Sequence, residues 1–385
     1  MSASPPTAEE LAGARWFGGK AAGIASVEVE DRLELGGGAA LSILLVDGAD
    51  RYLWTEGDVA SAICTGTVPV ANAWEFRDIR VTPVSAARPI GVDQSNTSYV
   101  VDERLVVKLY RRVWPGTHPE VELVEFLTGR VDSVPAFAGS CHWRGHAIGL
   151  LQDYVPGGID GWRWGADAII SGDATAIGRL GEVTAELHAA LAGLGAETAA
   201  PSAAAAWRAA AEAQLERAMA LVPESAAAQL EDYAPRIRAE LAPLAAPAEP
   251  PVLQRVHGDY HVGQILRAGE RLVVLDFEGE PTKPVVERSA PGTPLRDVAA
   301  MLRSFDHLGR YVNREAWPGH AANVDRWIER SRSAFLEGYG PVDEALLRAL
   351  EVEKECYEFI YAAGFEPSWM YAPEGGMRWL MEHDG

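Results

Sequence analysis

Two aspartates and a glutamine between residues 256 and 280 form the strongest chemical pattern in the sequence. Asp259 lies in VHGDYH, between two histidines, and Asp276 follows the apolar run Leu272–Leu275. Gln264 lies between the two aspartates and offers an amide oxygen. Transfer of a phosphoryl group from ATP requires a carboxylate that orients and deprotonates an acceptor hydroxyl, and oxygen ligands for magnesium. The pattern therefore predicts phosphoryl transfer that uses ATP and Mg²⁺.

The spacing assigns a role to each of these side chains. Asp259 is predicted to be the catalytic base. Gln264 and Asp276, helped by Glu278, are predicted to bind magnesium, because the run before Asp276 indicates a buried strand whose end is a usual place for ligands. Either aspartate motif alone would more often be a loop or a strand end, but the two together, in this order, favour a catalytic site.

A second polar segment, residues 91–112, predicts a strand, a turn and a second strand that carries Lys108. A lysine on a strand behind a polar hairpin is suited to hold the α- and β-phosphates of ATP. The sequence has no glycine-rich loop ahead of it. A polar stretch stands in that place and is predicted to cover phosphate, although taken alone it would be an ordinary hairpin turn; its residues are Ser95, Asn96, Thr97 and Ser98.

The composition narrows the class of protein. The chain has 385 residues and a formal net charge of −21 at pH 7, which argues against nucleic acid or an anionic membrane as a partner. It has no long apolar run and no signal-like N-terminus, so we expect a cytoplasmic protein, a monomer or small homo-oligomer. Its three cysteines are far apart in sequence and indicate neither a disulfide framework nor a zinc site.

The motifs resemble a known family. His-Gly-Asp-x-His-x-Gly-Gln followed by Leu-Asp-Phe-Glu-Gly-Glu-Pro is similar to the maltokinase-like branch of the aminoglycoside phosphotransferase superfamily. The resemblance implies an α+β, protein-kinase-like fold with two lobes. We expect a strand-rich N-terminal cap over residues 1–88, an N-lobe with the ATP-binding hairpin and hinge over residues 89–157, and a mostly helical C-lobe with the catalytic, metal and sugar sites over residues 158–385.

The same resemblance suggests further nucleotide contacts. Glu122, chosen over two neighbouring glutamates, is expected to pair with Lys108 from the following helix. The backbone groups of Asp153 and Val155 are expected to hydrogen-bond adenine at the hinge. Asp160 matches a position near the ribose, with a helix cap as the alternative.

Residues further along the chain are expected to support or line the acceptor site. Asp297 is expected to cap a helix and to brace the catalytic loop. Arg303 and Asp306, three residues apart on a predicted helix, can point together into the acceptor pocket, although a solvated salt bridge is an alternative. The other expected contacts with the sugar come from the C-terminal region and are Glu358, Tyr361, Glu366 and Trp369.

The C-terminal segment also departs from the family pattern. Maltokinases usually carry an arginine in an Asn-Arg-Pro-x-Trp element, whereas this chain has Glu366 at that position. A carboxylate in place of a cation favours an acceptor that carries an ammonium group, and one branch of the family acts on glucosamine. We therefore expect phosphorylation of glucosamine at its 6-hydroxyl. Maltose 1-phosphorylation, aminoglycoside phosphorylation, an inactive nucleotide-binding protein and a carbohydrate-binding module remain as alternatives.

Overall fold

The computed structural model describes residues 6–14, 17, 23–66, 71, 73–91, 96–280, 283 and 285–383. Ser95 of the predicted phosphate-covering stretch lies outside these residues. The chain forms two compact units, Met1–Gly157 and Gly158–Gly385. In the described ranges, no helix is both long and apolar enough to span a bilayer.

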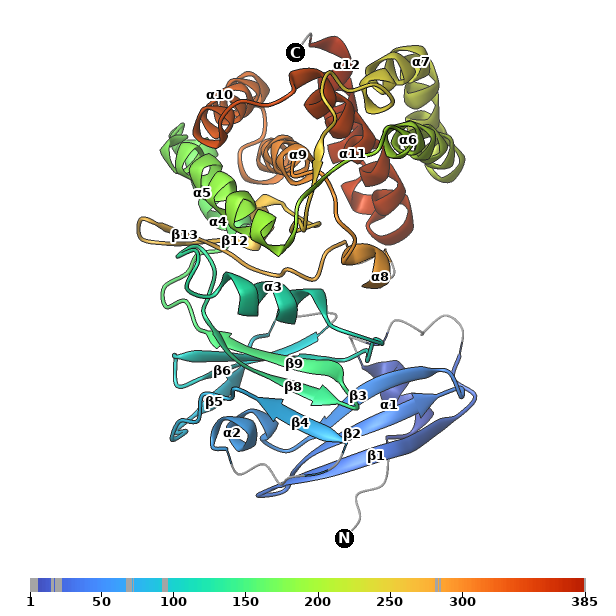
Figure 1. Ribbon diagram of the computed structural model, residues 1–385. Coiled ribbons are helices and arrows are strands. Elements are labelled where there is room, and N and C mark those ends of the chain that lie inside the picture. The colour runs from blue at the N-terminus through green and yellow to red at the C-terminus, as the bar shows by residue number, and fades with distance from the viewer. Residues whose placement is uncertain are drawn as a thin grey trace. The chain divides into compact units, whose positions relative to one another are not determined.

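The first unit begins with a small antiparallel sheet, as predicted. Its strands are β1 (Val27–Gly36), β2 (Ala39–Val46) and β3 (Asp50–Glu56), with the short helices α1 (Ala8–Gly13) and α2 (Val59–Cys64) beside them (Figure 1). Leu41, Ile43 and Leu53 are fully buried in the core that this sheet shares with the next one. Strand β2 is buried along almost its whole length, because Leu44 and Val46, on its other face, pack in a second core with Leu11 and Tyr52.

A six-stranded antiparallel sheet completes the first unit, in the order β4-β8-β9-β7-β6-β5. Its strands are β4 (Trp74–Arg77), β5 (Ala87–Pro89), β6 (Asn96–Val101), β7 (Leu105–Tyr110), β8 (Phe137–Trp143) and β9 (His146–Asp153). Helix α3 (Pro119–Leu127) packs against β8 and β9. The predicted boundary between residues 88 and 89 falls inside β5, and β4 also belongs to this sheet rather than to a separate cap.

The hairpin of β6 and β7 sets the position of Lys108. Asp102 and Glu103 have φ values of 50° and 52° at its tip, where a tight hairpin turn requires the left-handed region. The Arg104 N–H donates to the Val101 carbonyl at 3.0 Å and closes the turn. The resulting register places Lys108 directly opposite Ser98.

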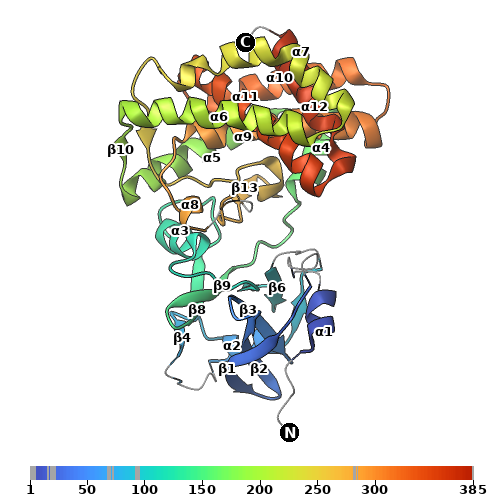
Figure 2. The same ribbon diagram turned by 90° about the vertical axis from the view of Figure 1, so that its right-hand side faces the viewer.

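The second unit is mostly helical. Helix α9 (Leu295–Tyr311) packs against α10 (Ala321–Tyr339), α11 (Glu344–Phe365) and α12 (Tyr371–Glu382) (Figure 1). Helices α6 (Pro201–Leu221) and α7 (Glu224–Glu240) lie against α11 (Figure 2). The remaining helices are α4 (Gly161–Ser171), α5 (Thr175–Leu191) and the short α8 (Val285–Arg288).

Close backbone contacts hold this unit together. Helices α5 and α10 touch through glycines, since a Cβ atom on Gly181 would lie 2.1 Å from the Phe335 carbonyl oxygen. The hairpin β12 (Ile265–Ala268) and β13 (Arg271–Val274) packs against α4 and α5. A second short pair, β10 (Glu197–Thr198) and β11 (Val252–Leu253), connects the helical layers. The loop before β12 carries Asp259.

Candidate active site

The catalytic loop is held by one buried carboxylate. Asp297 accepts hydrogen bonds from the N–H groups of His257 and Gly258 at 2.8 and 3.0 Å, and lies 3.2 Å from His188 Nε2. Burial alone would raise the pKa of Asp297, but His188 and the other donors hold it below its ordinary value. The predicted bracing role is confirmed. The predicted cap is wrong, because Asp297 lies inside the first turn of α9, which begins at Leu295.

Asp259 lies at the tip of this braced loop. Burial raises the pKa of its carboxyl group to about 6, against the opposing charges of Lys354 and His257. The imidazole of His257 anchors the loop to the end of β13 through a contact of 2.8 Å with the Leu275 carbonyl oxygen. Asp259 is therefore ionised at neutral pH and still basic enough to take a proton from an alcohol.

Gln264 and Asp276 come together on the β12–β13 hairpin. Strand β13 is buried, with Val273 and Val274 fully enclosed, and Asp276 follows its end as predicted. Asp276 has a φ of 66°, in the left-handed region that few residues other than glycine adopt. The Gln264 Nε2 group donates to Asp276 Oδ2 at 3.3 Å, which leaves the amide oxygen of Gln264 directed elsewhere. Carboxylate and amide oxygens in this arrangement fit a hard cation such as Mg²⁺, and the carboxylate of Glu278 lies two residues further on.

In the first unit, Lys108 pairs with Glu120 and not with the predicted Glu122. Lys108 Nζ lies 3.0 Å from Glu120 Oε2, and the Tyr110 hydroxyl donates to the same oxygen at 2.8 Å. Helix α3 begins at Pro119, and successive residues turn by about 100° along a helix, so residues two apart face nearly opposite ways. Glu120 is 1% exposed and faces the sheet, whereas Glu122 is half-buried on another side.

The predicted phosphate-covering residues are the first residues of β6. Asn96 and Ser98 are buried on the face that also carries Lys108. Thr97 faces the other way because side chains alternate along a strand, and its hydroxyl accepts a hydrogen bond from Arg111 Nε at 2.7 Å. The Thr97 side chain therefore points away from Lys108, and a contact between phosphate and the backbone of this stretch stays a prediction.

The other predicted nucleotide contacts, at Asp153, Val155 and Asp160, lie at the end of strand β9 and after it. The N–H of Asp153 donates to the Ala136 carbonyl at 2.9 Å, so that Asp153 can offer adenine only its carbonyl group. Val155, two residues on, is 8% exposed. Asp160 is the N-cap of α4 and accepts a hydrogen bond from the Arg163 N–H at 3.1 Å. The capping alternative holds for Asp160, and a contact with ribose stays a prediction.

A cavity of about 390 Å³ opens beside Asp259 in the second unit. Six of the predicted acceptor-site residues line it: Asp259, Arg303, Glu358, Tyr361, Glu366 and Trp369. Sequence reasoning missed other side chains that share this wall, among them Trp162, His261, His307 and Lys354. Helices α4, α9 and α11, together with the catalytic loop, bring them together.

A buried network of charges underlies this cavity. The Arg303 guanidinium is 1% exposed and contacts Glu351 and Glu355 at 3.1 and 3.5 Å. Glu355 also lies 2.9 Å from His307 Nε2, and although burial opposes protonation of His307, Glu355 raises its pKa above the ordinary value. Arg303 thus presents its guanidinium group, and His307 its imidazole, to the cavity from α9.

Asp306 does not have the predicted role. It is fully buried and ion-paired with Arg310 Nη2 at 3.1 Å, and it is not among the described residues that line the cavity. Although Arg303 and Asp306 are three residues apart on α9, each is engaged by different neighbours. The shared helix face therefore did not bring the two side chains into one pocket.

Aromatic rings form another part of the cavity wall. Trp369 packs edge-on against Trp162, with ring centroids 5.6 Å apart, and contacts Tyr311 at 6.2 Å. Tyr361, on α11, lines the same cavity. Such rings provide apolar surface next to polar groups, which matches the mixed character of a sugar.

Carboxylates lie at the end of the cavity formed by α11. Glu358 is paired with Lys354 Nζ at 2.8 Å, and although burial opposes its ionisation, Lys354 and His307 lower its pKa. Glu366 follows the last residue of α11 and accepts a hydrogen bond from the Ser368 hydroxyl at 2.7 Å. The carboxyl end of a helix also carries partial negative charge. The carboxylate of Glu366 can therefore face a cationic group, whereas that of Glu358 is already paired with Lys354.

A family model described as the phosphotransferase enzyme family matches residues 86–350. The chain belongs to this phosphotransferase family. The matched range contains Lys108, Asp259 and Asp276, which are the residues of the predicted transfer chemistry. It ends before Glu358, Glu366 and Trp369, so that the acceptor end of the cavity lies beyond the part common to the family.

Curated relatives of this phosphotransferase include two glucosamine kinases. The protein from Streptacidiphilus jiangxiensis is 32% identical over 390 residues, covering 89% of this chain and 88% of that protein. The one from Mycolicibacterium smegmatis is 33% identical over 404 residues, covering 91% and 98%. A solved structure of a glucosamine kinase in complex with glucosamine, ADP and inorganic phosphate is 28% identical with a TM-score of 0.78, covering 98% of this chain and all of that one. The similarity extends through the C-terminal helices, and the protein-kinase-like fold is confirmed.

Proposed function

We propose that this phosphotransferase is a glucosamine kinase that transfers the γ-phosphoryl group of ATP to the 6-hydroxyl of glucosamine. The observation that carries the proposal is the cavity that places Asp259 together with Glu358 and Glu366. A base is thereby combined with carboxylates suited to an ammonium group. The two glucosamine kinases that cover most of this chain support the same acceptor.

In the proposed reaction, the acceptor hydroxyl points at Asp259. The carboxylate takes the hydroxyl proton while the sugar oxygen bonds to the γ-phosphorus. The bond from that phosphorus to the bridging oxygen breaks, and ADP leaves with the electron pair. The phosphoryl group moves in line, without a covalent intermediate on the protein.

Nucleotide-binding roles are proposed within each unit separately. Lys108, fixed by Glu120, contacts the phosphates, and Asn96 and Ser98 lie on the same face of the sheet. Gln264 and Asp276, with Glu278, would hold Mg²⁺, which supplies positive charge to the triphosphate. The brace from Asp297 keeps the catalytic loop in position.

The sugar would lie with its apolar face on the aromatic rim of Trp162 and Trp369. Its hydroxyl oxygens would meet the cationic side of the cavity at Arg303 and His307. Its ammonium group would then point to the carboxylates of Glu358, on α11, and Glu366, which follows the last residue of α11. An acetyl group on this nitrogen removes the charge, so that N-acetylglucosamine should bind much more weakly.

The experiment that tests the proposal is an ADP-release assay with Mg²⁺ across glucosamine, N-acetylglucosamine, glucose, maltose and kanamycin. We expect turnover with glucosamine and at most weak turnover with the other four. Glucose is the matched control, since it has a hydroxyl where glucosamine has the amine. Turnover of maltose or kanamycin in preference to glucosamine would refute the assignment of the acceptor.

The proposal extends to the setting of the reaction. Because ATP is the phosphoryl donor, we place the enzyme in the cytoplasm, and we propose that it acts as a monomer or small homo-oligomer. Its acceptor is a small sugar, with no nucleic-acid or membrane partner. Sedimentation and cell fractionation test these statements.

A further inference from the structure

Lysine is rare in this chain. Only four of its 34 basic residues are lysines: Lys20, Lys108, Lys283 and Lys354. Lys20 lies outside the described residues. Lys283 is exposed, with its Nζ 3.0 Å from Glu280. Lys108 and Lys354 are the two described lysines with mostly buried side chains, and each has a glutamate partner. The mechanism above uses Lys108 and leaves Lys354 without a role.

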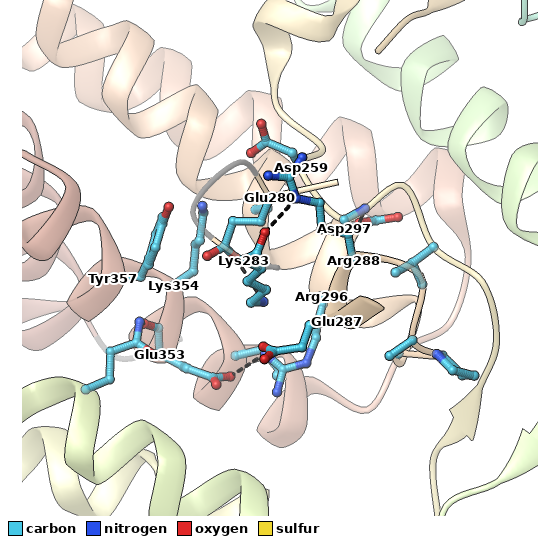
Figure 3. Close-up of a pocket in the computed structure, with 18 residues that line it drawn as sticks. Asp259, Glu280, Lys283, Glu287, Arg288, Arg296, Asp297, Glu353, Lys354 and Tyr357 are labelled. Carbon is cyan, nitrogen blue, oxygen red and sulfur yellow. Dashed lines mark hydrogen bonds and ion pairs between the residues drawn. The ribbon is translucent and has the colours of Figure 1, made fainter. Parts of the chain in front are cut away.

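Lys354 lies where two cavities of the second unit meet. Beside the acceptor cavity is a smaller one of about 230 Å³ (Figure 3). Among the described residues, four line both cavities: Asp259, Ala300, Lys354 and Tyr357. Ala300 has the smallest side chain of the four and takes little space. The junction is therefore formed by the catalytic carboxylate, one ammonium group and one phenol.

The ammonium group of Lys354 is oriented by one carboxylate and keeps N–H donors for a ligand. Glu358, one turn further along α11, lies 2.8 Å from its Nζ and is the one described carboxylate within 4.0 Å of it. Nζ also lies 4.4 Å from the centre of the Tyr357 ring, and Figure 3 shows both side chains on the same wall of the cavity. An ammonium group has three N–H donors, and one carboxylate oxygen occupies one of them. The remaining donors can reach a ligand at the junction.

A cation at this place suits the transferred group. The acceptor oxygen must be next to Asp259, so the phosphorus that bonds to it passes the same junction. Charge on the three non-bridging oxygens of the phosphoryl group needs donors during transfer. Lys354 stays charged, because Glu358 and Asp259 raise its pKa despite burial.

We propose that Lys354 is a catalytic residue that donates hydrogen bonds to the phosphoryl group while it moves to the acceptor oxygen. The lysine keeps its proton throughout, whereas the hydroxyl proton goes to Asp259. The bond to the sugar oxygen forms and the bond to ADP breaks, as in the reaction above. This inference rests on the proposed kinase function but not on which sugar is the acceptor.

The first test compares Lys354→Met with Lys283→Met, which removes an exposed lysine from the smaller cavity. With the best acceptor of the panel, Lys354→Met should lower kcat by about 100-fold, with the KM values for ATP and sugar changed by less than about threefold. Lys283→Met should stay within about twofold of the wild-type kcat. Lys354→Arg, which keeps the charge, should recover part of the lost turnover.

A second measurement uses the wild-type enzyme and needs the variants only to assign its signals. Lysine labelled at Nζ has only four signals in this chain, and the two methionine variants assign those of Lys354 and Lys283. With ADP, Mg²⁺ and the sugar bound, addition of aluminium fluoride, which mimics the transferring group, should shift the Lys354 signal and leave Lys283 unchanged.

The outcomes separate this inference from the proposed acceptor. If glucosamine is inactive but another sugar is phosphorylated, the acceptor assignment fails while the Lys354 comparison proceeds with that sugar. If no sugar is active, the aluminium fluoride measurement still decides. A folded Lys354→Met with a kcat within threefold of wild type, or a Lys354 signal that ignores aluminium fluoride, would overturn the inference.

Discussion

Two lysine–glutamate pairs, one buried in the first unit and one half-buried in the second, differ in how they are built. Lys108 on β7 reaches Glu120 on α3, across two elements. Lys354 and Glu358 lie one turn apart on the single helix α11. The first pair therefore exists only when the helix docks on the sheet with the right face, whereas the second is present wherever α11 forms.

The two pairs also leave different amounts of the lysine available. Glu120 is 1% exposed and shares its oxygens between Lys108 and Tyr110, so the first pair is a fixed support. The second pair borders two cavities and the catalytic carboxylate. We propose that the first pair helps to hold the nucleotide, while the lysine of the second pair takes part in the transfer.

Removal of the predicted base, Asp259, should have the largest effect on turnover. Asp259→Asn keeps the shape of the side chain but cannot accept the hydroxyl proton, so turnover should fall by about 10³- to 10⁴-fold. The dissociation constant of ATP, measured by calorimetry, should be nearly unchanged because Lys108 and its partner are intact. Near wild-type turnover would remove Asp259 from its role.

The next largest effect should come from the first pair. Glu120→Gln leaves Lys108 buried without its carboxylate, which should lower the free energy of unfolding by about 3 kcal/mol, since breaking a buried pair is strongly destabilising. Glu122→Gln is the matched control on the same helix and should change it by less than about 0.5 kcal/mol. Urea denaturation measures both, and equal effects would contradict the pairing.

The pH dependence of turnover sharpens the comparison further. Asp259 must be ionised, and its pKa is about 6, so kcat should fall as the pH drops below 6 and level off above it. Loss of the Lys354 charge should move this acidic limb to higher pH, because that charge lowers the pKa of Asp259.

Lys108→Met should leave the acidic limb of the pH profile in place, because Lys108 is not one of the main charges that act on Asp259. Those charges are Lys354, His257, Asp276 and Glu358. Profiles of kcat from pH 5 to 9 in the two variants measure this. Equal shifts of the limb would mean that the two lysines do not differ in the proposed way.

The smallest effect is expected at the rim of the acceptor cavity. Glu366 is exposed, so solvent screens its charge, and Glu366→Gln should raise the KM for glucosamine only about threefold, less at high salt. The KM for ATP should not change. Glu344→Gln, at the opposite end of α11, is the control, and an equal rise there would rule out a local contact with the amine.

Sequence reasoning found the part of the site that is local in the chain. Asp259, Gln264 and Asp276 lie on one loop and one hairpin, so that their spacing and the buried strand between them were sufficient. The partner of Lys108 was assigned wrongly, because the choice between Glu120 and Glu122 depends on which face of α3 meets the sheet. That face is set by packing at Pro119 and beyond, which residue types alone do not specify.

The acceptor cavity could be predicted only in part. Its wall comes from α4, α9, α11 and the catalytic loop, so residues such as Trp162 and His307 meet only in the folded unit. Asp306 was misplaced because its helix face was known but its neighbour Arg310 was not considered. Lys354 did leave a signal, since a lysine is rare here and Glu358 follows it at helical spacing.

The charged floor of the acceptor cavity limits how this protein can change over generations. Glu355 pairs with both Arg303 and His307, and Glu351 pairs with both Arg303 and Arg332, so that a replacement at any one of them disturbs the charge balance of the others. These residues are therefore expected to change together. Glu366 is exposed and lines the same cavity outside this network, so a substitution there should leave the buried charges in place.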